Sequence, residues 1–371
     1  MSNGPPLHAV VLAGGSGERF WPASRRDLPK QFLRVVGNQT LLDATLERAR
    51  HFAARERIWV VCGSEHARAV RRASGLPAGR VLVEPRRRNT AMACAWAAQR
   101  IAAESPDAVI ALLPADHHVP DAGAFADDIR RASRAAVGAS VLVTLGIVPT
   151  RPETGYGYIR VGEPAGRGFA RLHRVSRFVE KPSLARARRY LVDGGYLWNA
   201  GVFVWTAEAL LREIESHAPP LHRALAPLRR KPRGRNRQAV EAAYGRAPSL
   251  PIDVAVMERS ASVWTLPARF AWSDVGTWDS LAEQLGVGSK GRPPSGGGDT
   301  AGNRVIGGEL LAEDARGNLV WGGKRLVVLL GVEDLAVVDT DDVIFVTKLG
   351  GRSDVRRIVA TLRARDRDDL T

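Results

Sequence analysis

Through the first 150 residues, short apolar runs alternate with longer segments whose apolar residues recur at helical spacing. The apolar runs occupy residues 8–12, 58–62, 81–83, 109–113 and 141–147. The segments with helical spacing are 40–51, 65–74, 90–103 and 124–137. Strands that are apolar throughout and alternate with helices are typical of a parallel sheet covered on both faces. We therefore predict an α/β fold, in which a Rossmann-like, mostly parallel mixed sheet is flanked by helices.

The pattern changes after residue 150. Strand-like stretches at 174–180 and 197–205 precede helical stretches at 207–215 and 236–244. Residues 286–298 are rich in Gly, Pro and Ser, which is typical of a linker. Short strands are then expected at 303–308, 317–320, 326–330, 335–339 and 343–346, before a terminal helix at 354–363. The predicted domains are a large α/β domain (1–285), a linker (286–299) and a small β-rich domain with a terminal helix (300–371).

The chain of 371 residues carries a formal net charge of +15 and a sequence pI of about 10.8. Such a charge suggests nucleic acid as a partner. The basic residues are spread along the chain, however, and the dense run at 229–237 accompanies no nucleic-acid-binding motif, so we interpret it as a solvated loop. Cys62 and Cys94 lie in apolar segments, and no apolar run is long enough for a membrane span. We expect a cytoplasmic protein with reduced, buried thiols.

A glycine-rich loop follows the first predicted strand. Gly14, Gly15 and Gly17 let the backbone approach a bulky anion and direct its N–H groups at it. Arg19 can grip phosphate oxygens in a fork, and Lys30 adds a mobile point charge. The spacing excludes a P-loop, whose lysine directly follows a glycine, and a dinucleotide-binding turn, because a phenylalanine occupies the third glycine position. The loop therefore predicts a nucleoside-triphosphate cradle of another kind.

Carboxylates stand at the ends of two later strands. Asp116 follows the fourth apolar run, where a carboxylate across from the cradle is well placed to hold Mg²⁺. Glu84 ends the third run and can accept hydrogen bonds from guanine N1–H and the 2-amino group. His117 and His118 do not indicate zinc, because no further ligand stands at a suitable spacing. Before residue 231 the chain has lysine only at 30 and 181, which indicates that a compact point charge is needed at both places.

The order of motifs resembles the sugar-phosphate nucleotidyltransferases, and among them the mannose-1-phosphate guanylyltransferase family. The resemblance rests on G-G-x-G-x-R, P-K, E-P-x-x-R-N-T, P-A-D-H, E-K-P, W-N-A-G and D-V-G, which follow one another along the chain. It covers residues 8 to about 285 strongly and 300 to 360 weakly. The chain departs from the family pattern at Met92, where proline is common.

The resemblance implies a role for each matching residue. The implied catalytic residues are Arg19, Lys30, Asp116 and Lys181. The implied nucleotide-binding residues are Leu12, Ala13, Gly14, Gly15, Gly17, Glu84, Arg88, Asn89 and Thr90. The implied sugar-phosphate-binding residues are Gly157, Glu180, Lys181, Asn199 and Gly201. The implied ligands of a Mg²⁺ cofactor are Asp116 and Asp274.

The resemblance also implies the reaction: transfer of GMP from GTP to α-D-mannose 1-phosphate, which gives GDP-mannose and pyrophosphate. The catalytic domain is then residues 1–285, and the C-terminal domain is a left-handed parallel β-helix. The expected partners are GTP, mannose 1-phosphate and a second copy of the chain in a homodimer, with no nucleic acid and no membrane. Two alternatives remain at this point: a nucleotidyltransferase for another nucleotide or hexose 1-phosphate, and a non-catalytic regulatory or nucleic-acid-binding relative.

Overall fold

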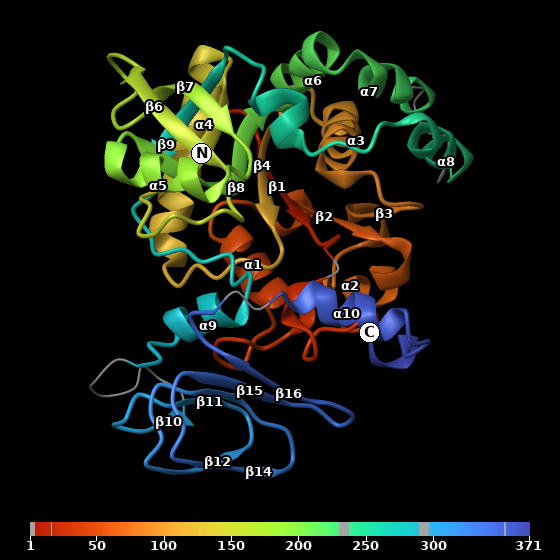
Figure 1. Cartoon of the computed structure of the whole chain (residues 1–371). Helices are drawn as coiled ribbons and strands as arrows, with labels where there is room; N and C mark the ends of the chain where they lie inside the picture. The colour runs from red at the N-terminus through yellow and green to blue at the C-terminus, as the bar shows by residue number, and fades with distance from the viewer. Residues whose placement is uncertain (1–3, 16, 230–236, 289–296, 352–353) are drawn as a thin grey trace. The chain divides into compact units, whose positions relative to one another are not determined.

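The computed structural model describes residues 4–15, 17–229, 237–288, 297–351 and 354–371 (Figure 1). Contacts divide the chain into two compact units. The first unit comprises residues 1–14, 45–115 and 119–272, and the second comprises 15–44, 116–118 and 273–371. The second unit therefore holds part of the glycine loop as well as the C-terminal residues. The predicted linker, 286–299, falls largely on residues outside the described ranges and stays a prediction.

The first unit is built on a nine-stranded sheet with the strand order β3-β2-β1-β4-β8-β5-β9-β7-β6 (Figure 1). The strands are β1 (Leu7–Leu12), β2 (Ile58–Gly63), β3 (Val81–Glu84), β4 (Val109–Pro114), β5 (Leu142–Ile147), β6 (Tyr158–Pro164), β7 (His173–Val179), β8 (Tyr196–Thr206) and β9 (Val263–Pro267). The helices of this unit include α2 (Ala67–Ser74), α3 (Asn89–Glu104), α4 (Ala122–Ala139), α5 (Leu184–Asp193), α6 (Ala207–His217), α7 (Pro219–Ala224) and α8 (Arg237–Arg246). Helix α1 (Leu41–Arg50) crosses from the second unit into the first.

The predicted sheet is parallel only in part. β3, β2, β1 and β4 run parallel to one another, and β9 runs parallel to β5. β8 pairs antiparallel with both β4 and β5, and β6 and β7 form an antiparallel pair. Strands β7 and β8 therefore run opposite to the other seven, and the sheet is mixed, with most strands in one direction, as expected. The reversal of β8 could not be predicted, because a fully buried strand is apolar whichever way it runs, so its composition does not reveal its direction.

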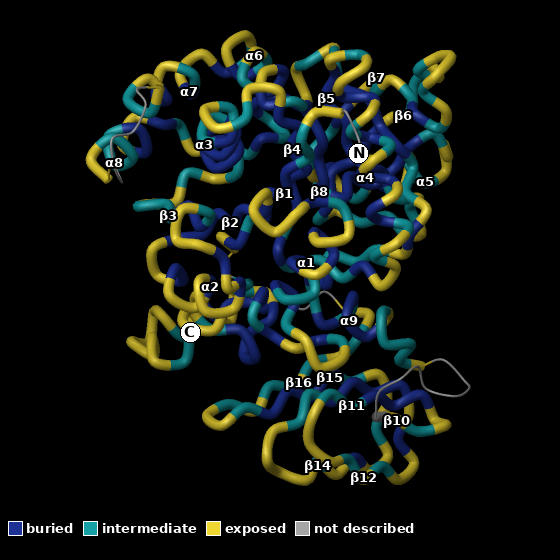
Figure 2. Tube along the Cα trace, turned by 180° about the vertical axis from the view of Figure 1, so that it is seen from behind, coloured by how far each residue is buried: buried dark blue, intermediate teal, exposed yellow. Residues whose placement is uncertain are grey.

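The core of the first unit fills both sides of the central strands. On one side, Val10, Val61 and Leu112 pack in a cluster that also includes residues of α3 and α6. Their neighbours along each strand point to the other side because side chains alternate across a sheet, and α4 packs against β4, β5 and β8 (Figure 1). The central strands are accordingly the most buried stretches of the tube in Figure 2. This core fixes the strand ends from which the candidate site is built.

The second unit contains the C-terminal β-rich domain. Its strands are β10 (Gly297–Gly298), β11 (Arg304–Ile306), β12 (Glu309–Glu313), β13 (Leu319–Trp321), β14 (Leu326–Leu330), β15 (Leu335–Asp339) and β16 (Ile344–Lys348). β11, β13 and β15 pair in parallel on one side, and β12 and β14 pair in parallel on another. Strand β12 is absent from the sequence prediction. The buried amide of Asn318 bonds to Asn303 Oδ1 at 2.9 Å and links successive turns of this coil.

The segment after the glycine loop packs into the core of the second unit. Phe20 and Trp21 lie in one apolar cluster with Trp278 of α9 (Trp278–Gln284), with residues of β15 and with α10 (Val355–Arg363). Trp278 Nε1 donates to the Trp21 carbonyl at 3.1 Å. The predicted terminal helix is thereby confirmed as α10. Aromatic residues that follow the glycine loop in sequence therefore anchor it to the core of the second unit.

Candidate active site

The glycine loop leaves β1 through Leu12 and Ala13. Ala115 N–H donates to the Leu12 carbonyl at 3.0 Å, and Ala13 N–H donates to a carbonyl of β2 at 2.8 Å. Gly14 then lies beside Glu84, because a Cβ at Gly14 would stand 3.6 Å from Glu84 Oε2. The ends of β1 and β3 thus bring the first glycine of the cradle and the predicted base-binding carboxylate together.

The Glu84 carboxyl is half-buried at the end of β3. Burial raises the pKa of Glu84 to about 7, and the nearby Glu65 adds to the rise, while the Tyr244 hydroxyl and Arg87 oppose it. Near neutral pH the carboxyl therefore exists in both protonation states. Only the ionised form offers acceptors on both oxygens, which is what the two donors of a guanine edge require.

The second part of the loop belongs to the second unit. Gly17 has a φ of 65°, and a Cβ there would fall 2.6 Å from Lys30 Cβ, so both the backbone conformation and the space require glycine. Gly15 has nothing within 4 Å of its added Cβ. Arg19 follows in a short 3₁₀ turn, η1 (Glu18–Phe20), whose phenylalanine is fully buried. The loop is therefore held tightly at Gly17 and is open at Gly15.

Lys30 connects three segments of the second unit. It is only 4% exposed, and its ammonium donates to Asp116 Oδ2 at 2.9 Å and to the backbone carbonyl of Asp274. The two acidic segments are themselves joined, because His118 and Ser273 exchange backbone hydrogen bonds of 2.9 and 3.0 Å. The predicted catalytic lysine and both predicted metal ligands thus lie in one cluster.

Charge in this cluster favours the ionised form of Asp116. Burial opposes ionisation of Asp116, but the Lys30 ammonium, with His117 and Arg19, holds the pKa of its carboxyl below the usual value. Asp274 Oδ1 accepts from Gly276 N–H at 2.9 Å. Val275, between Asp274 and Gly276, has a φ of 44°, which is unusual for a β-branched residue. This backbone conformation is part of the turn that carries Asp274.

The donor set fits a magnesium ion. Within the described residues, no group of three or more His, Cys, Asp and Glu side chains gathers to form a complete metal cage. Magnesium is commonly held by one or two carboxylates and takes its other ligands from water and substrate phosphates. Asp116 and Asp274, next to a glycine loop, match that kind of site.

The residues predicted to bind the sugar phosphate lie in the first unit. Asn199 on β8 is 9% exposed, and its Nδ2 donates to Asp253 Oδ1 at 2.8 Å. Asn199 Oδ1 accepts from Thr144 Oγ1 at 3.0 Å and from Gly201 N–H at 3.1 Å. Both lone pairs of the amide oxygen are used inside the protein. We expected Asn199 both to donate to a hexose and to accept from it. Since only one N–H of its amide is left over, Asn199 can donate one hydrogen bond to a sugar and accept none.

Gly157, Glu180 and Lys181 come together beside Asn199. A Cβ at Gly157 would fall 2.8 Å from Glu180 Oε2 and 3.3 Å from the Asn199 Cβ, so a larger residue would push these side chains apart. The Lys181 ammonium pairs with Glu180 Oε1, and the Lys181 side chain is 62% exposed. A cation this accessible can turn from its carboxylate toward an incoming phosphate.

Comparison with known proteins identifies the family of the chain. Residues 8–286 match the family model described as nucleotidyl transferase, and residues 308–362 match one described as MannoseP isomerase/GMP-like beta-helix domain. The chain belongs to the nucleotidyl transferase family. Within this family, it falls with the mannose-1-phosphate guanylyltransferases. The Escherichia coli (strain K12) protein of that name is 36% identical over 98% of this chain and 75% of its own length.

Two further proteins are similar to this chain over nearly its whole length. The alginate biosynthesis protein AlgA of Pseudomonas aeruginosa is 37% identical over 97% of this chain and 73% of its own length. A crystal structure described as mannose-1-phosphate geranyltransferase from Thermus thermophilus has a TM-score of 0.84 and 36% identity, covering 96% of this chain and 99% of that one. The nucleotidyltransferase fold and the β-rich C-terminal domain are thereby confirmed.

Asp253 is a residue that the motifs of the family did not indicate. It begins a short π-helical turn, η7 (Asp253–Met257), and holds the amide of Asn199. Burial raises the pKa of Asp253 to about 7, and Glu180 adds to the rise, while Lys181 and Asn199 oppose it. The available signal was one acidic residue inside the apolar run 250–257.

The remaining nucleotide-site predictions, Arg88, Asn89 and Thr90, lie where β3 leads into α3. Arg88 Nε donates to the Tyr244 carbonyl at 2.8 Å, and Thr90 Oγ1 accepts from Ile252 N–H at 2.8 Å. Asn and Thr are usual N-cap residues, but neither Asn89 nor Thr90 caps α3. The cap position is Arg88 without a side-chain bond, because Asn89 has a φ of 60° and the Thr90 hydroxyl is used elsewhere.

Proposed function

We propose that this protein transfers GMP from GTP to α-D-mannose 1-phosphate, giving GDP-mannose and pyrophosphate. The observation that carries the proposal is the Lys30 ammonium, which is held between the Asp116 carboxylate and the Asp274 backbone and whose side chain packs against Gly17 of the glycine loop. The choice of guanine and mannose is supported by the relatives, which include the Escherichia coli mannose-1-phosphate guanylyltransferase.

In the proposed reaction, a phosphate oxygen of mannose 1-phosphate attacks the α-phosphorus of GTP. The bond between the α-phosphorus and the oxygen that bridges to the β-phosphate breaks, and pyrophosphate leaves with the electron pair. Because the nucleophile is already an anion, no general base is needed. The main difficulty is the repulsion between two anions, so positioning and charge neutralisation carry the rate.

Each basic residue has a place in this scheme. Arg19 and Lys30 balance charge on the α-phosphate and the departing pyrophosphate, and the N–H groups of the glycine loop bind phosphate oxygens. The exposed Lys181 binds the phosphate of the incoming sugar and leaves Glu180 to accept from sugar hydroxyls. Asn199 donates to the hexose through its remaining N–H.

A Mg²⁺ cofactor, held by Asp116 and Asp274, supplies further positive charge for the triphosphate when bound. The low pKa of Asp116 supports this assignment, because a magnesium ligand must be ionised. The pairing of Lys30 with Asp116 keeps that carboxylate charged and in position beforehand.

The test is pyrophosphate release with GTP, Mg²⁺ and mannose 1-phosphate, with each omitted in turn. A panel of four nucleoside triphosphates against the 1-phosphates of mannose, glucose and N-acetylglucosamine gives the selectivity. We expect release only with all three components, and fastest with GTP and mannose 1-phosphate. Equal rates with another pair would reassign the substrates, and salt-sensitive RNA binding without turnover would favour a non-catalytic relative.

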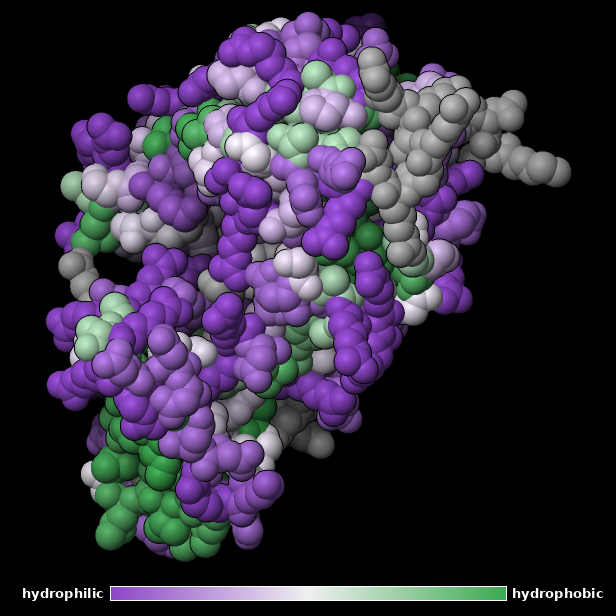
Figure 3. Space-filling view, turned by 90° about the vertical axis from the view of Figure 1, so that its right-hand side faces the viewer, coloured by the Kyte–Doolittle hydropathy of each residue, from purple (hydrophilic) through white to green (hydrophobic). Residues whose placement is uncertain are grey.

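Assembly and location complete the proposal. The C-terminal coil winds as a left-handed parallel β-helix, in keeping with its parallel pairing on two sides. A homodimer is supported by an apolar patch on the outer side of β12 and β14, where Leu311, Leu326, Val328 and Leu330 are 48–71% exposed (Figure 3). Light scattering on the purified chain tests the dimer.

The proposed location is the cytoplasm. Buried free thiols at Cys62 and Cys94 fit its reducing conditions. Among the described residues, no helix has the length and apolar character to cross a bilayer.

A further inference from the structure

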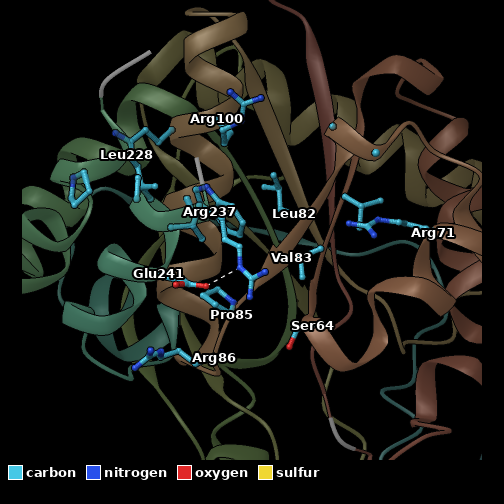
Figure 4. A pocket seen from close by; sticks show the side chains of 18 residues that line it. Ser64, Arg71, Leu82, Val83, Pro85, Arg86, Arg100, Leu228, Arg237 and Glu241 are labelled. Atoms are coloured by element: carbon cyan, nitrogen blue, oxygen red, sulfur yellow. Dashed lines mark hydrogen bonds and ion pairs between the residues drawn. The ribbon is translucent and has the colours of Figure 1, made fainter. Parts of the chain in front are cut away.

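A cavity of about 1010 Å³ lies along β3, the edge strand of the large sheet (Figure 4). Its floor is apolar and consists of the β3 residues Val81, Leu82 and Val83 with Trp96 of α3. Among the described residues that line it, none belongs to the candidate active site. The cavity is therefore separate from the groups assigned above to GTP and mannose 1-phosphate.

Arginine side chains surround this floor. Arg71 comes from α2, Arg86 follows β3, Arg100 comes from α3 and Arg237 from α8. Among the described lining residues Glu241 is the one acid against four arginines, so these groups carry a net positive charge. Figure 4 shows Arg71 and Arg237 reaching toward Leu82 and Val83 from opposite sides.

The positive charge of the cavity is only partly neutralised. Glu241 Oε1 accepts from Arg237 Nε at 2.9 Å, and Arg100 pairs with Glu104 at 3.0 Å. Within the described residues, Arg71 and Arg86 have no carboxylate within 4.0 Å. Guanidinium groups bind phosphate through two parallel hydrogen bonds, so Arg71 and Arg86 are available for an anion.

We propose that this cavity binds a phosphorylated small molecule with an apolar or planar body, the class to which nucleotides and nucleotide sugars belong. The arginines take the phosphate, and the half-buried apolar side chains of the lining, Val83, Leu228 and Val240, take the body. A bare phosphate would leave these side chains exposed to water, and a purely apolar ligand would leave the guanidinium groups without a partner. The volume is at the upper end of the roughly 300–1000 Å³ usual for ligand pockets.

The test is equilibrium dialysis with GDP-mannose, in the absence of pyrophosphate so that it cannot react. We expect two molecules bound per chain. The double variant Arg71→Glu, Arg86→Ala should weaken one of the two sites about tenfold or more, because both substitutions remove charge-assisted bonds to phosphate. Arg72→Glu is the matched control, since Arg72 is an exposed neighbour on α2 outside the cavity lining, and it should leave both sites unchanged.

Two more probes define the ligand. Inorganic tripolyphosphate should bind to the cavity at least tenfold more weakly than GDP-mannose, because it cannot cover the apolar side chains of the lining. GDP-mannose binding that is unchanged at every site by Arg71→Glu, equal effects of Arg71→Glu and Arg72→Glu, or tripolyphosphate that binds as well as GDP-mannose would each overturn the proposal. A single site that is lost in Arg71→Glu would support the cavity and count against the proposed active site. Tighter binding of single-stranded oligothymidylate that depends on Arg71 would do the same and assign the cavity to nucleic acid. Pyrophosphate release is measured separately, so binding that depends on Arg71 stands or falls independently of the proposed activity.

Discussion

The ammonium of Lys30 donates to Asp116 Oδ2 at 2.9 Å, although the two residues are 86 positions apart in the sequence. Lys30 is 4% exposed, and the same ammonium also bonds to the Asp274 carbonyl. The cation is therefore fixed in place before any substrate arrives. Charge that needs no reorganisation during the reaction is the most effective form of transition-state stabilisation.

Lys30→Ala should lower kcat/KM for GDP-mannose formation by about 10²–10³. Asp116→Ala should cause a loss of the same size, because it removes both the proposed magnesium ligand and the partner of Lys30. Lys30→Arg should not restore activity, since a planar guanidinium cannot occupy the space of a compact ammonium in a buried site. The measurement is the initial rate of pyrophosphate release.

The matched control is Lys324→Ala in the C-terminal domain. Lys324 pairs with Asp341 at 3.6 Å, and both side chains are almost fully exposed, so its removal should leave the rate unchanged. Circular dichroism checks that each variant is folded. A folded Lys30→Ala protein that works within tenfold of the wild type would show that the role assigned to Lys30 is wrong.

Gly17→Ala should damage both stability and activity. The left-handed φ of 65° costs an alanine about 1–2 kcal/mol, and its Cβ would lie 2.6 Å from Lys30 Cβ, so Lys30 must move. Gly15→Ala is the control for stability, because its Cβ would meet nothing within 4 Å. Urea unfolding should show a loss for Gly17→Ala alone. Equal midpoints for the two variants would contradict the close approach of Gly17 to Lys30.

The predicted phosphate side of the site could be read from the sequence because its residues occur in short contiguous motifs that resemble those of a known family. Lys30, Asp116 and Asp274 were each assigned this way, and the structure brings them together. Asp253 could not be predicted from such motifs, because its role depends on a contact with Asn199, which is 54 positions away in the sequence. Apolar periodicity locates an acidic residue in a buried run but does not say what it touches.

The same limit applied to the fold. The apolar runs located β1, β2, β3, β4 and β5 to within one or two residues, since burial on both faces makes these strands apolar throughout. The direction of β8 and the existence of β12 depend on which strands become neighbours. Strand β12, with exposed residues alternating along it, looks like a turn in sequence and becomes a strand only by pairing with β14.

Recognition of GTP should depend on pH through Glu84. With a pKa of about 7, its carboxyl ionises between pH 6 and 8 and gains an acceptor for the guanine edge, so KM for GTP should fall across that range. Glu84→Gln should flatten this dependence, and at pH 8 it should lower the preference for GTP over ATP about tenfold. The titrations of the substrates are common to both proteins and cancel in the comparison. Identical pH profiles for the two proteins would remove Glu84 from the base site.

Asp253 should make the stability of the protein depend on pH. Its pKa is about 7 in the folded state, against 3.8 for an ordinary aspartate. Between these values the folded protein binds more protons at this site than the unfolded chain, so this group's contribution to stability falls as pH rises from about 4 to about 7. Below pH 4 the carboxyl of Asp253 is protonated in both the folded and the unfolded protein, and its contribution to the free energy of unfolding is at its maximum.

Asp253→Asn replaces the carboxyl with a neutral group of the same shape and keeps an oxygen to accept from Asn199 Nδ2. The thermal midpoint of the variant, measured relative to that of the wild type, should therefore rise from pH 4.5 to pH 8. Asp107→Asn, at an exposed position, should show no such trend. A pH-independent difference for Asp253→Asn would mean that the carboxyl is already ionised at low pH, and that the cluster of Glu180, Lys181 and Asn199 does not hold it neutral.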